Sequence, residues 1–288
     1  MDRIPTRARW PGMKRLWFIT NPQSGSSDAA KAEAILAACA ERGLALAGRI
    51  DFPRDDLPTP ESLAEAKVDT VVLFAGDGTI NAAVCALADW DGAILVLPGG
   101  TMNMLAKSLH GDADPAAIIA AAHDEERRVA LPFVEAGNHR ALVGLIVGPA
   151  ANWYRAREHI RKRRLADLWP AVRTAWRRTF GKGVRLVGAP GFPPQAQAAY
   201  VRPSGDGLAV MAIDARDFRS IADLGWNLIT GDWVAAHAVT DVETPHLTIA
   251  ERRSVLALFD GEPVMLDPAT MILAGRTREQ FVATKLAE

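Results

Sequence analysis

One pattern occurs three times in the N-terminal part of the chain: an apolar run, a polar loop with glycine, and a stretch with helical spacing of apolar residues. The apolar runs are residues 16–19, 70–74 and 93–97. Because these runs are continuous and do not alternate with polar residues, each predicts a strand buried on both faces. Strand, loop and helix in alternation predict a parallel α/β sheet, with the three loops at the carboxyl ends of their strands.

The C-terminal part of the chain has a different pattern. Turn residues such as Asp260-Gly261 separate short apolar runs, which predict strands over residues 184–187, 198–202, 208–213, 246–249, 255–259 and 264–266. Short strands with Asp-Gly turns between them indicate an antiparallel sandwich. We therefore expect an α/β plus β chain: a Rossmann-like parallel α/β domain over residues 13–132, followed by an antiparallel β-sandwich domain over residues 133–288. The C-terminal tail can pack back on the first domain.

Charge and cysteine content exclude several classes of protein. The 288 residues include 33 basic and 34 acidic side chains, a net charge of −1, which argues against a globally basic nucleic-acid binder. Two cysteines, Cys39 and Cys85, are too few for a disulfide framework or a cysteine-rich zinc site and suggest a reducing compartment. No apolar run reaches the roughly 18 residues of a membrane span. We expect a cytoplasmic protein whose contact with membranes is peripheral.

The three glycine loops, residues 21–27, 75–79 and 98–101, would lie at one edge of the sheet. There they would present backbone N–H groups and helix N-termini to the same crevice, an arrangement that binds phosphate. The chain lacks the P-loop, the dinucleotide G-x-G-x-x-G, the protein-kinase H-R-D and D-F-G motifs, H-E-x-x-H and G-x-S-x-G. For any single loop, the alternative is a plain turn between strand and helix.

Asp77 lies inside the second of these loops. A carboxylate there repels a bound phosphate unless Mg²⁺ lies between them or the carboxylate handles a proton. Alternatively, Asp77 caps the helix that follows, a role that aspartate fills well. The residue pattern alone favours neither interpretation.

Four motifs together resemble the diacylglycerol kinase catalytic-domain family, which includes bacterial soluble lipid kinases, sphingosine kinases and ceramide kinases, and is distantly similar to NAD kinases. They occur in the order of the family, and the resemblance covers nearly the whole chain. The motifs are Asn21-Pro22-Gln23-Ser24-Gly25, Gly76-Asp77-Gly78-Thr79-Ile80-Asn81, Pro98-Gly99-Gly100-Thr101-Met102-Asn103 and Asp260-Gly261-Glu262.

The resemblance implies an ATP- and Mg²⁺-dependent lipid kinase with ATP between a nucleotide-binding and a lipid-binding domain. Diacylglycerol is the substrate implied by default. Ceramide or another sphingoid lipid is the rival substrate, and a catalytically weak regulator that binds lipid or nucleotide at the membrane is the alternative of a different class. The residues that the resemblance assigns to the nucleotide are Asn21, Pro22, Ser24, Gly25, Ala75, Gly76, Asp77, Gly78, Thr79, Asn81, Gly100, Thr101 and Asn103.

The catalytic groups implied by the resemblance are Glu262, Asp260 and Asp77. Glu262 matches the position usually treated as the proton acceptor, and Asp260 shares that role or helps to bind metal. Asp77 would lie against the triphosphate with Mg²⁺ nearby. From the residues alone, Asp260-Gly261 is first of all a hairpin turn between two apolar runs.

A second Gly-Asp-Gly sequence, residues 205–207, resembles a turn of the family that holds a structural Mg²⁺. Asp206 would contribute its side chain, and Leu208 and Pro203 their carbonyl groups. One carboxylate with carbonyls and water is a normal ligand set for this ion. A simple turn is the alternative.

The chain departs from the family at several positions. Ala75 replaces a common glycine, and Met104 stands where the family often has an acidic residue. Residues 148–151 lack the acidic residue that sphingosine kinases use for the lipid head group, which leaves the lipid open. The adenine-side threonine of the family has no clear match around residues 49–54.

Residues 153–182 form a basic, tryptophan-rich segment. Residues 155–182 include ten basic residues and only two acidic ones, Glu158 and Asp167. Trp169 and Trp176 belong to a pattern of apolar residues at helical spacing. Such a segment suits an anionic membrane surface, here the inner face of the membrane. Alternatively, the tryptophans pack into the second domain and the arginines are solvated. The segment contains no recognisable nucleic-acid-binding module. The sequence is also compatible with a homodimer.

Overall fold

A computed structural model describes residues 12–22, 29–100, 103–125, 127–148, 183–193, 196, 198–205, 207–213 and 240–285. The chain divides into two compact units. Unit 1 comprises Met1–Ala130 with Arg278–Glu288, and unit 2 comprises Leu131–Thr277.

Unit 1 is built on a six-stranded sheet with the strand order β2-β1-β3-β4-β17-β5. All neighbouring strands pair in parallel except β5, which is antiparallel to β17. Every residue of β3 is buried, as its continuous apolar run predicts. The strands are β1 (Arg15–Thr20), β2 (Ala45–Asp51), β3 (Thr70–Ala75), β4 (Ala93–Pro98), β5 (Arg128–Val129) and β17 (Gln280–Val282).

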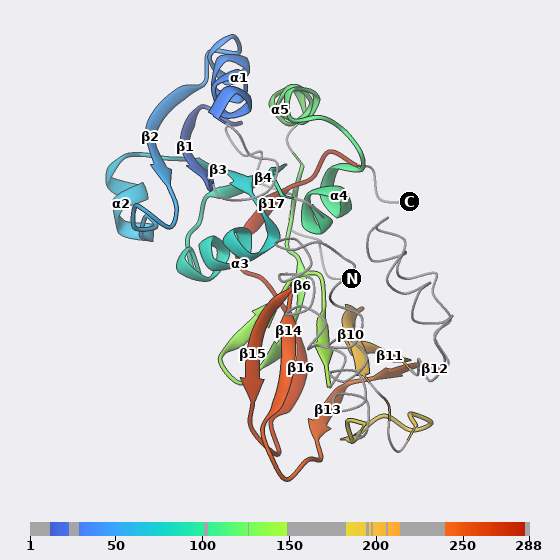
Figure 1. Cartoon of the computed structure of the whole chain (residues 1–288). Coiled ribbons are helices and arrows are strands. Elements are labelled where there is room, and N and C mark those ends of the chain that lie inside the picture. Colours follow the sequence, from blue (N-terminus) through green and yellow to red (C-terminus); the bar gives the residue numbers. More distant parts are fainter. Residues whose placement is uncertain are drawn as a thin grey trace, which may run out of the picture. The chain divides into compact units, whose positions relative to one another are not determined.

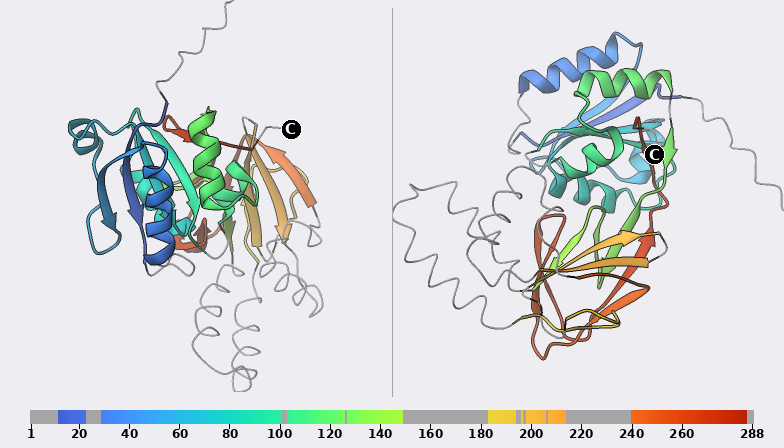
Figure 2. Two further views of the ribbon diagram at one scale, coloured as in Figure 1. Left: turned by 90° about the horizontal axis from the view of Figure 1, so that it is seen from above. Right: turned by 90° about the vertical axis from the view of Figure 1, so that its right-hand side faces the viewer.

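Helices cover both faces of this sheet. The helices α1 (Ala29–Ala40) and α5 (Pro115–Asp124) lie side by side on one face, where they bury one set of strand side chains (Figures 1 and 2). The helices α2 (Pro60–Glu65) and α3 (Asp77–Ala86) lie on the other face (Figure 1), and α4 (Met104–His110) follows β4. Two helices are capped at their N-termini by side chains. Thr59 is the N-cap of α2, and Asp114 is the N-cap of α5.

Unit 2 consists of two antiparallel sheets. A six-stranded sheet has the order β12-β11-β10-β8-β14-β15, and a five-stranded sheet has the order β7-β6-β16-β13-β9. Their strands are β6 (Pro132–Ala136), β7 (His139–Ala141), β8 (Leu145–Val147), β9 (Leu186–Val187), β10 (Ala198–Ser204), β11 (Gly207–Ile213), β12 (Thr240–Thr244), β13 (His246–Ile249), β14 (Val255–Phe259), β15 (Glu262–Leu266) and β16 (Met271–Arg276).

Both sheets of unit 2 contribute to one hydrophobic cluster. Val134 and Ile272 come from the five-stranded sheet, and Val147, Val201 and Phe259 come from the six-stranded sheet. The expected combination of a parallel α/β part and an antiparallel part is therefore confirmed.

The end of the chain is anchored on α4. The backbone amides of Thr284 and Lys285 donate to the carbonyl of Leu109, over 3.1 and 2.9 Å. His110 is buried, and its Nδ1 lies 2.9 Å from Oγ1 of Thr284. Burial lowers the pKa of His110 to about 4, so the imidazole is neutral at neutral pH.

Acidification should destabilise unit 1 through His110. The folded chain holds the pKa of His110 at about 4, against 6.5 ordinarily. As the pH falls, the unfolded chain therefore binds the proton first, and stability is lost between about pH 6.5 and pH 4. Denaturant unfolding at pH 7 and pH 5 should show a free-energy loss about 2 kcal/mol larger in the wild type than in His110→Gln. Equal losses in the two proteins would contradict this assignment.

Candidate functional site

The loops that follow β1, β3 and β4 lie at one edge of the unit 1 sheet, because these strands run parallel and pair as neighbours. A side-chain hydrogen bond joins the first loop to the start of α3: Nδ2 of Asn21 donates to Oγ1 of Thr79 over 2.8 Å. These residues are 58 positions apart. The structure thus brings together two of the loops that the sequence assigned to phosphate.

The loops after β3 and β4 touch through their backbones. A Cβ atom on Gly99 would lie 2.5 Å from the backbone nitrogen of Ala75, and one on Gly100 would lie 2.7 Å from Cα of Gly76. Both positions therefore require glycine. Oδ1 of Asn103 accepts from the amide of Gly100 over 2.6 Å, and Asn103 adopts a left-handed backbone with φ of 51°, which asparagine tolerates.

The helix α3 begins at Asp77, so Asp77, Gly78 and Thr79 belong to its first turn. Gly76 is the N-cap and provides no side-chain cap. The first-turn amides of a helix have no acceptor within the helix, and the helix dipole adds partial positive charge there. This helix start therefore fits a phosphate group.

The carboxylate of Asp77 reaches the next helix, α4. It is largely buried, and its two oxygens accept from the amides of Met104 and Leu105, the first residues of α4, over 3.5 Å each. Burial raises the pKa of Asp77, and the hydrogen bonds from Leu105 and Met104 oppose that shift. Asp77 thus also binds the first amides of α4, with its partner Leu105 lying 28 positions away in the sequence.

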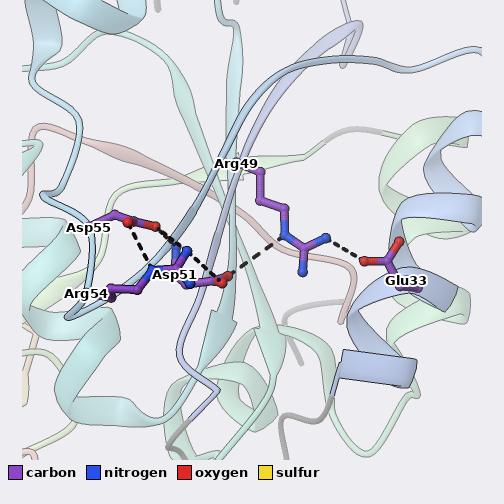
Figure 3. Close-up of polar contacts among 5 residues, drawn as sticks. All are labelled: Glu33, Arg49, Asp51, Arg54 and Asp55. Atoms are coloured by element: carbon purple, nitrogen blue, oxygen red, sulfur yellow. Dashed lines mark hydrogen bonds and ion pairs between the residues drawn. The ribbon is translucent and has the colours of Figure 1, made fainter.

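Five charged residues surround the end of β2, a cluster that the sequence interpretation missed (Figure 3). Asp51 ends β2 beside Thr20 of β1. The guanidinium of Arg49 pairs with Glu33 of α1, and Arg54 pairs with Asp51 and Asp55 over 3.2 and 3.1 Å (Figure 3). Oδ2 of Asp55 also accepts from the amide of Asp51 over 2.8 Å.

This charged cluster stands where the resemblance would place the adenine-side threonine. Exposed ion pairs of this kind add little stability, so the main effect of the cluster is to fix the shape of the turn after β2. The alternation of signs over residues 49–55 was the only signal in the sequence.

In unit 2, Asp260 and Gly261 form the turn between β14 and β15, as the Asp-Gly signal predicts. The Asp260 carboxylate lies against three consecutive backbone amides. Oδ2 accepts from Leu142 over 2.7 Å, and Oδ1 accepts from Val143 and Gly144 over 2.9 and 3.0 Å. Asp260 therefore holds the segment 142–144 between β7 and β8.

Tyr200 of β10 holds the same segment. Its hydroxyl donates to the carbonyl of Val143 over 3.2 Å, and a Cβ atom on Gly144 would lie 2.4 Å from the tyrosine ring. Burial raises the pKa of Tyr200 to about 12. The segment is thus bound by Asp260 and Tyr200, a contact for which the sequence carried no local signal.

Glu262 opens β15 and is exposed. Within the part of the chain that the structure describes, no hydrogen bond or ion pair engages its carboxylate. The two acids of the Asp260-Gly261-Glu262 motif therefore differ sharply, because one carboxylate is bound to backbone amides and the other is available to solvent.

Several predicted site residues lie outside the described residues: Ser24, Gly25, Thr101, Asp206 and the segment 153–182. Pro203 and Leu208 pair with each other at the end of the β10–β11 hairpin. Among the described residues, no group of three or more His, Cys, Asp or Glu side chains could hold a metal ion. None of the described helices is long and apolar enough to span a bilayer.

Comparison with known proteins finds a family model that matches most of unit 1. Residues 15–132 match the model of the diacylglycerol kinase catalytic domain. A search of the curated proteins finds no match to this chain. Kinases of such a family use ATP as phosphate donor.

Solved structures show the fold of the chain as a whole. A diacylglycerol kinase from Bacillus anthracis strain Sterne is 15% identical, with a TM-score of 0.65 over 96% of this chain and 98% of that one. A structure of "a putative diacylglycerol kinase" from the same strain is 17% identical, with a TM-score of 0.64 over 94% of this chain and 97% of that one. The resemblance that the motifs carry is thus confirmed over residues 15–132, which match the diacylglycerol kinase catalytic domain, and the solved structures share the fold of the chain.

Proposed function

We propose that this protein is an ATP-dependent lipid kinase that transfers the γ-phosphate to a hydroxyl group of a membrane lipid, with diacylglycerol as the substrate. The observation that carries the proposal is the joined set of loops beside the uncapped start of α3, inside the region that matches a kinase family. We also infer that unit 1 is a Rossmann-like nucleotide domain and that the two sheets of unit 2 form a lipid-binding sandwich. The hydrophobic cluster that the two sheets share supports the sandwich arrangement.

The nucleotide would lie at the carboxyl edge of the unit 1 sheet. Backbone amides at Gly78 and Thr79 would take phosphate oxygens, because they are first-turn amides of an uncapped helix. Asn21 would support them through its bond to Thr79. The remaining nucleotide contacts are assigned as the resemblance implies, to Pro22, Ser24, Gly25, Ala75, Gly76, Asn81, Gly100, Thr101 and Asn103.

The residues present fit a Mg²⁺ ion that is held largely by phosphate and water. Such an ion needs only one or two carboxylates from the protein, and Asp77 offers one at the loop that would carry the phosphates. When bound, Mg²⁺ neutralises phosphate charge during transfer. A second, structural Mg²⁺ would be held by Asp206 with the carbonyls of Pro203 and Leu208.

In the transfer, the lipid hydroxyl oxygen forms a bond to the γ-phosphorus as the bond to the β,γ-bridging oxygen breaks, and ADP leaves. We assign acceptance of the hydroxyl proton to Glu262, whose carboxylate is exposed. Asp260 is a positioning residue, because a proton on its carboxylate would disrupt its bonds to the amides of 142–144.

Loss of the Glu262 carboxylate should abolish most of the transfer. With labelled ATP and a panel of diacylglycerol, ceramide and sphingosine in mixed micelles, we expect labelled diacylglycerol from the wild type. Glu262→Gln should lower kcat by at least about 100-fold and leave ATP binding unchanged. Glu65→Gln, an exposed glutamate of α2, is the matched control and should retain full activity.

Labelling of ceramide in place of diacylglycerol would show that the protein is a sphingoid-lipid kinase. ATP binding without transfer to any lipid would favour a regulator that binds nucleotide.

Substitution of Asp260 should lower the stability of the fold, whereas substitution of Glu262 should not. Asn at position 260 tolerates the left-handed backbone, and it brings an NH₂ group against backbone N–H donors in place of a carboxylate oxygen. We expect Asp260→Asn to lower the free energy of unfolding by about 2 kcal/mol, and Glu262→Gln to change it by less than about 0.5 kcal/mol. Urea unfolding measures both, and a large loss in Glu262→Gln would contradict the different roles assigned to the two acids.

Asn21 and Thr79 should act on ATP binding as one unit. Asn21→Ala and Thr79→Val each break the 2.8 Å hydrogen bond between the two loops, so each should raise the Kd for ATP several-fold. The double variant should be little weaker than either single variant. Calorimetric titration with ATP measures all four proteins, and fully additive effects would show that the bond does not support the nucleotide site.

A further inference from the structure

The outer face of the five-stranded sheet in unit 2 carries a row of exposed apolar side chains. On this sheet Leu186, Leu247 and Ile272 are buried, so the residues that alternate with them face outward. The exposed fractions of the outward residues Val187, Met271 and Leu273 are 53%, 50% and 39%. These are large apolar side chains for which the described residues provide no cover.

Strand pairing makes this row continuous. Val187 of β9 pairs with Thr248 of β13, and Thr248 pairs with Met271 of β16. Leu273 lies two positions further along β16 and pairs with Glu135 of β6. We call Val187, Thr248, Met271 and Leu273 the apolar row.

On the β6 side, the apolar row ends at a neutralised pair of charges. The carboxylate of Glu135 pairs with the guanidinium of Arg140 over 3.0 Å, and Arg140 also lies over the ring of Phe133, 4.6 Å from its centroid. This side of the face therefore offers no net charge to a partner.

On the β9 side, three exposed arginines follow the apolar row: Arg185, Arg252 and Arg253. They are close in the fold, because the carbonyl of Arg185 accepts from the amide of Ala250 over 2.9 Å. Glu251, the residue before Arg252, accepts from the backbone amide of Arg185 over 2.8 Å. Within the described part of the chain, no ion pair engages any of the three guanidinium groups.

We propose that the apolar row, with Arg185, Arg252 and Arg253, is a surface by which unit 2 docks on an anionic lipid bilayer. A few exposed apolar side chains beside unpaired cations match the boundary between acyl chains and anionic headgroups. A standard protein interface buries about 800 Å² on each partner, far more than three half-exposed side chains offer. The proposal rests on the proposed function, since a lipid kinase must reach a substrate in a bilayer.

The test is co-sedimentation of the full chain with vesicles of phosphatidylcholine, alone or mixed with phosphatidylglycerol. The wild type should bind the mixed vesicles and bind them less as salt is raised. The double variant Met271→Ser/Leu273→Ser should bind at least about fivefold more weakly. Arg252→Gln/Arg253→Gln should lose on the order of tenfold and much of the salt dependence. Leu46→Ser, which changes an exposed leucine of β2 in unit 1, should bind as the wild type does.

A kinase assay separates this proposal from the proposed function. With a short-chain, water-soluble diacylglycerol, all three variants should match the wild type, whereas the two double variants should be slower on long-chain diacylglycerol in vesicles. Absence of phosphate transfer to either lipid would contradict the proposed function. The vesicle-binding experiment would still test whether this face binds membranes.

Unchanged vesicle binding in both double variants would overturn the proposal. So would a wild-type dimer in sedimentation velocity that Met271→Ser/Leu273→Ser dissociates while vesicle binding persists. That outcome would assign the face to a second copy of the chain.

Discussion

The close approach of the loops after β3 and β4 is the constraint on which the candidate site depends. These strands pair in parallel along their whole length, so their chains leave the sheet at adjacent points. The two backbones come so close that neither Gly99 nor Gly100 has room for a Cβ atom. This contact places the start of α4 beside the start of α3, and the bond between Asn21 and Thr79 adds the loop after β1.

Asp77 and Asp260, one half-buried acid in each unit, have the same physical role. Asp77 accepts from the first amides of α4, and Asp260 accepts from the amides of 142–144. A carboxylate that receives hydrogen bonds from several backbone amides fixes the position of the segment to which they belong, here the start of α4 and residues 142–144. The acid available for proton transfer in the assigned motif is accordingly the exposed one, Glu262, and its neighbour sets the turn from which it projects.

The parts of the structure that could be predicted from sequence are those encoded locally. Continuous apolar runs identified β1, β3 and β4, and the Asp-Gly pair identified the turn at residues 260–261. The short strand β17 could not be found in this way, because three residues carry little periodicity and their place beside β4 depends on the rest of unit 1. The same holds for the contact of Asp77 with α4, since no local pattern encodes a partner 28 positions away. The cluster around Asp51 was missed because its ion pairs join residues from α1 and the end of β2 that only the fold brings together.

We propose that the start of α3 and the touching glycine loops hold the phosphates of ATP. The most direct measurement is amide NMR of the protein labelled with ¹⁵N-glycine, titrated with ATP, ADP and adenosine. We expect ATP and ADP to shift the amide signals of Gly76, Gly78 and Gly100, and adenosine to leave them nearly unchanged. The signals of Gly43 and Gly137 should not respond. Equal shifts with adenosine, or shifts confined to other glycines, would contradict this proposal.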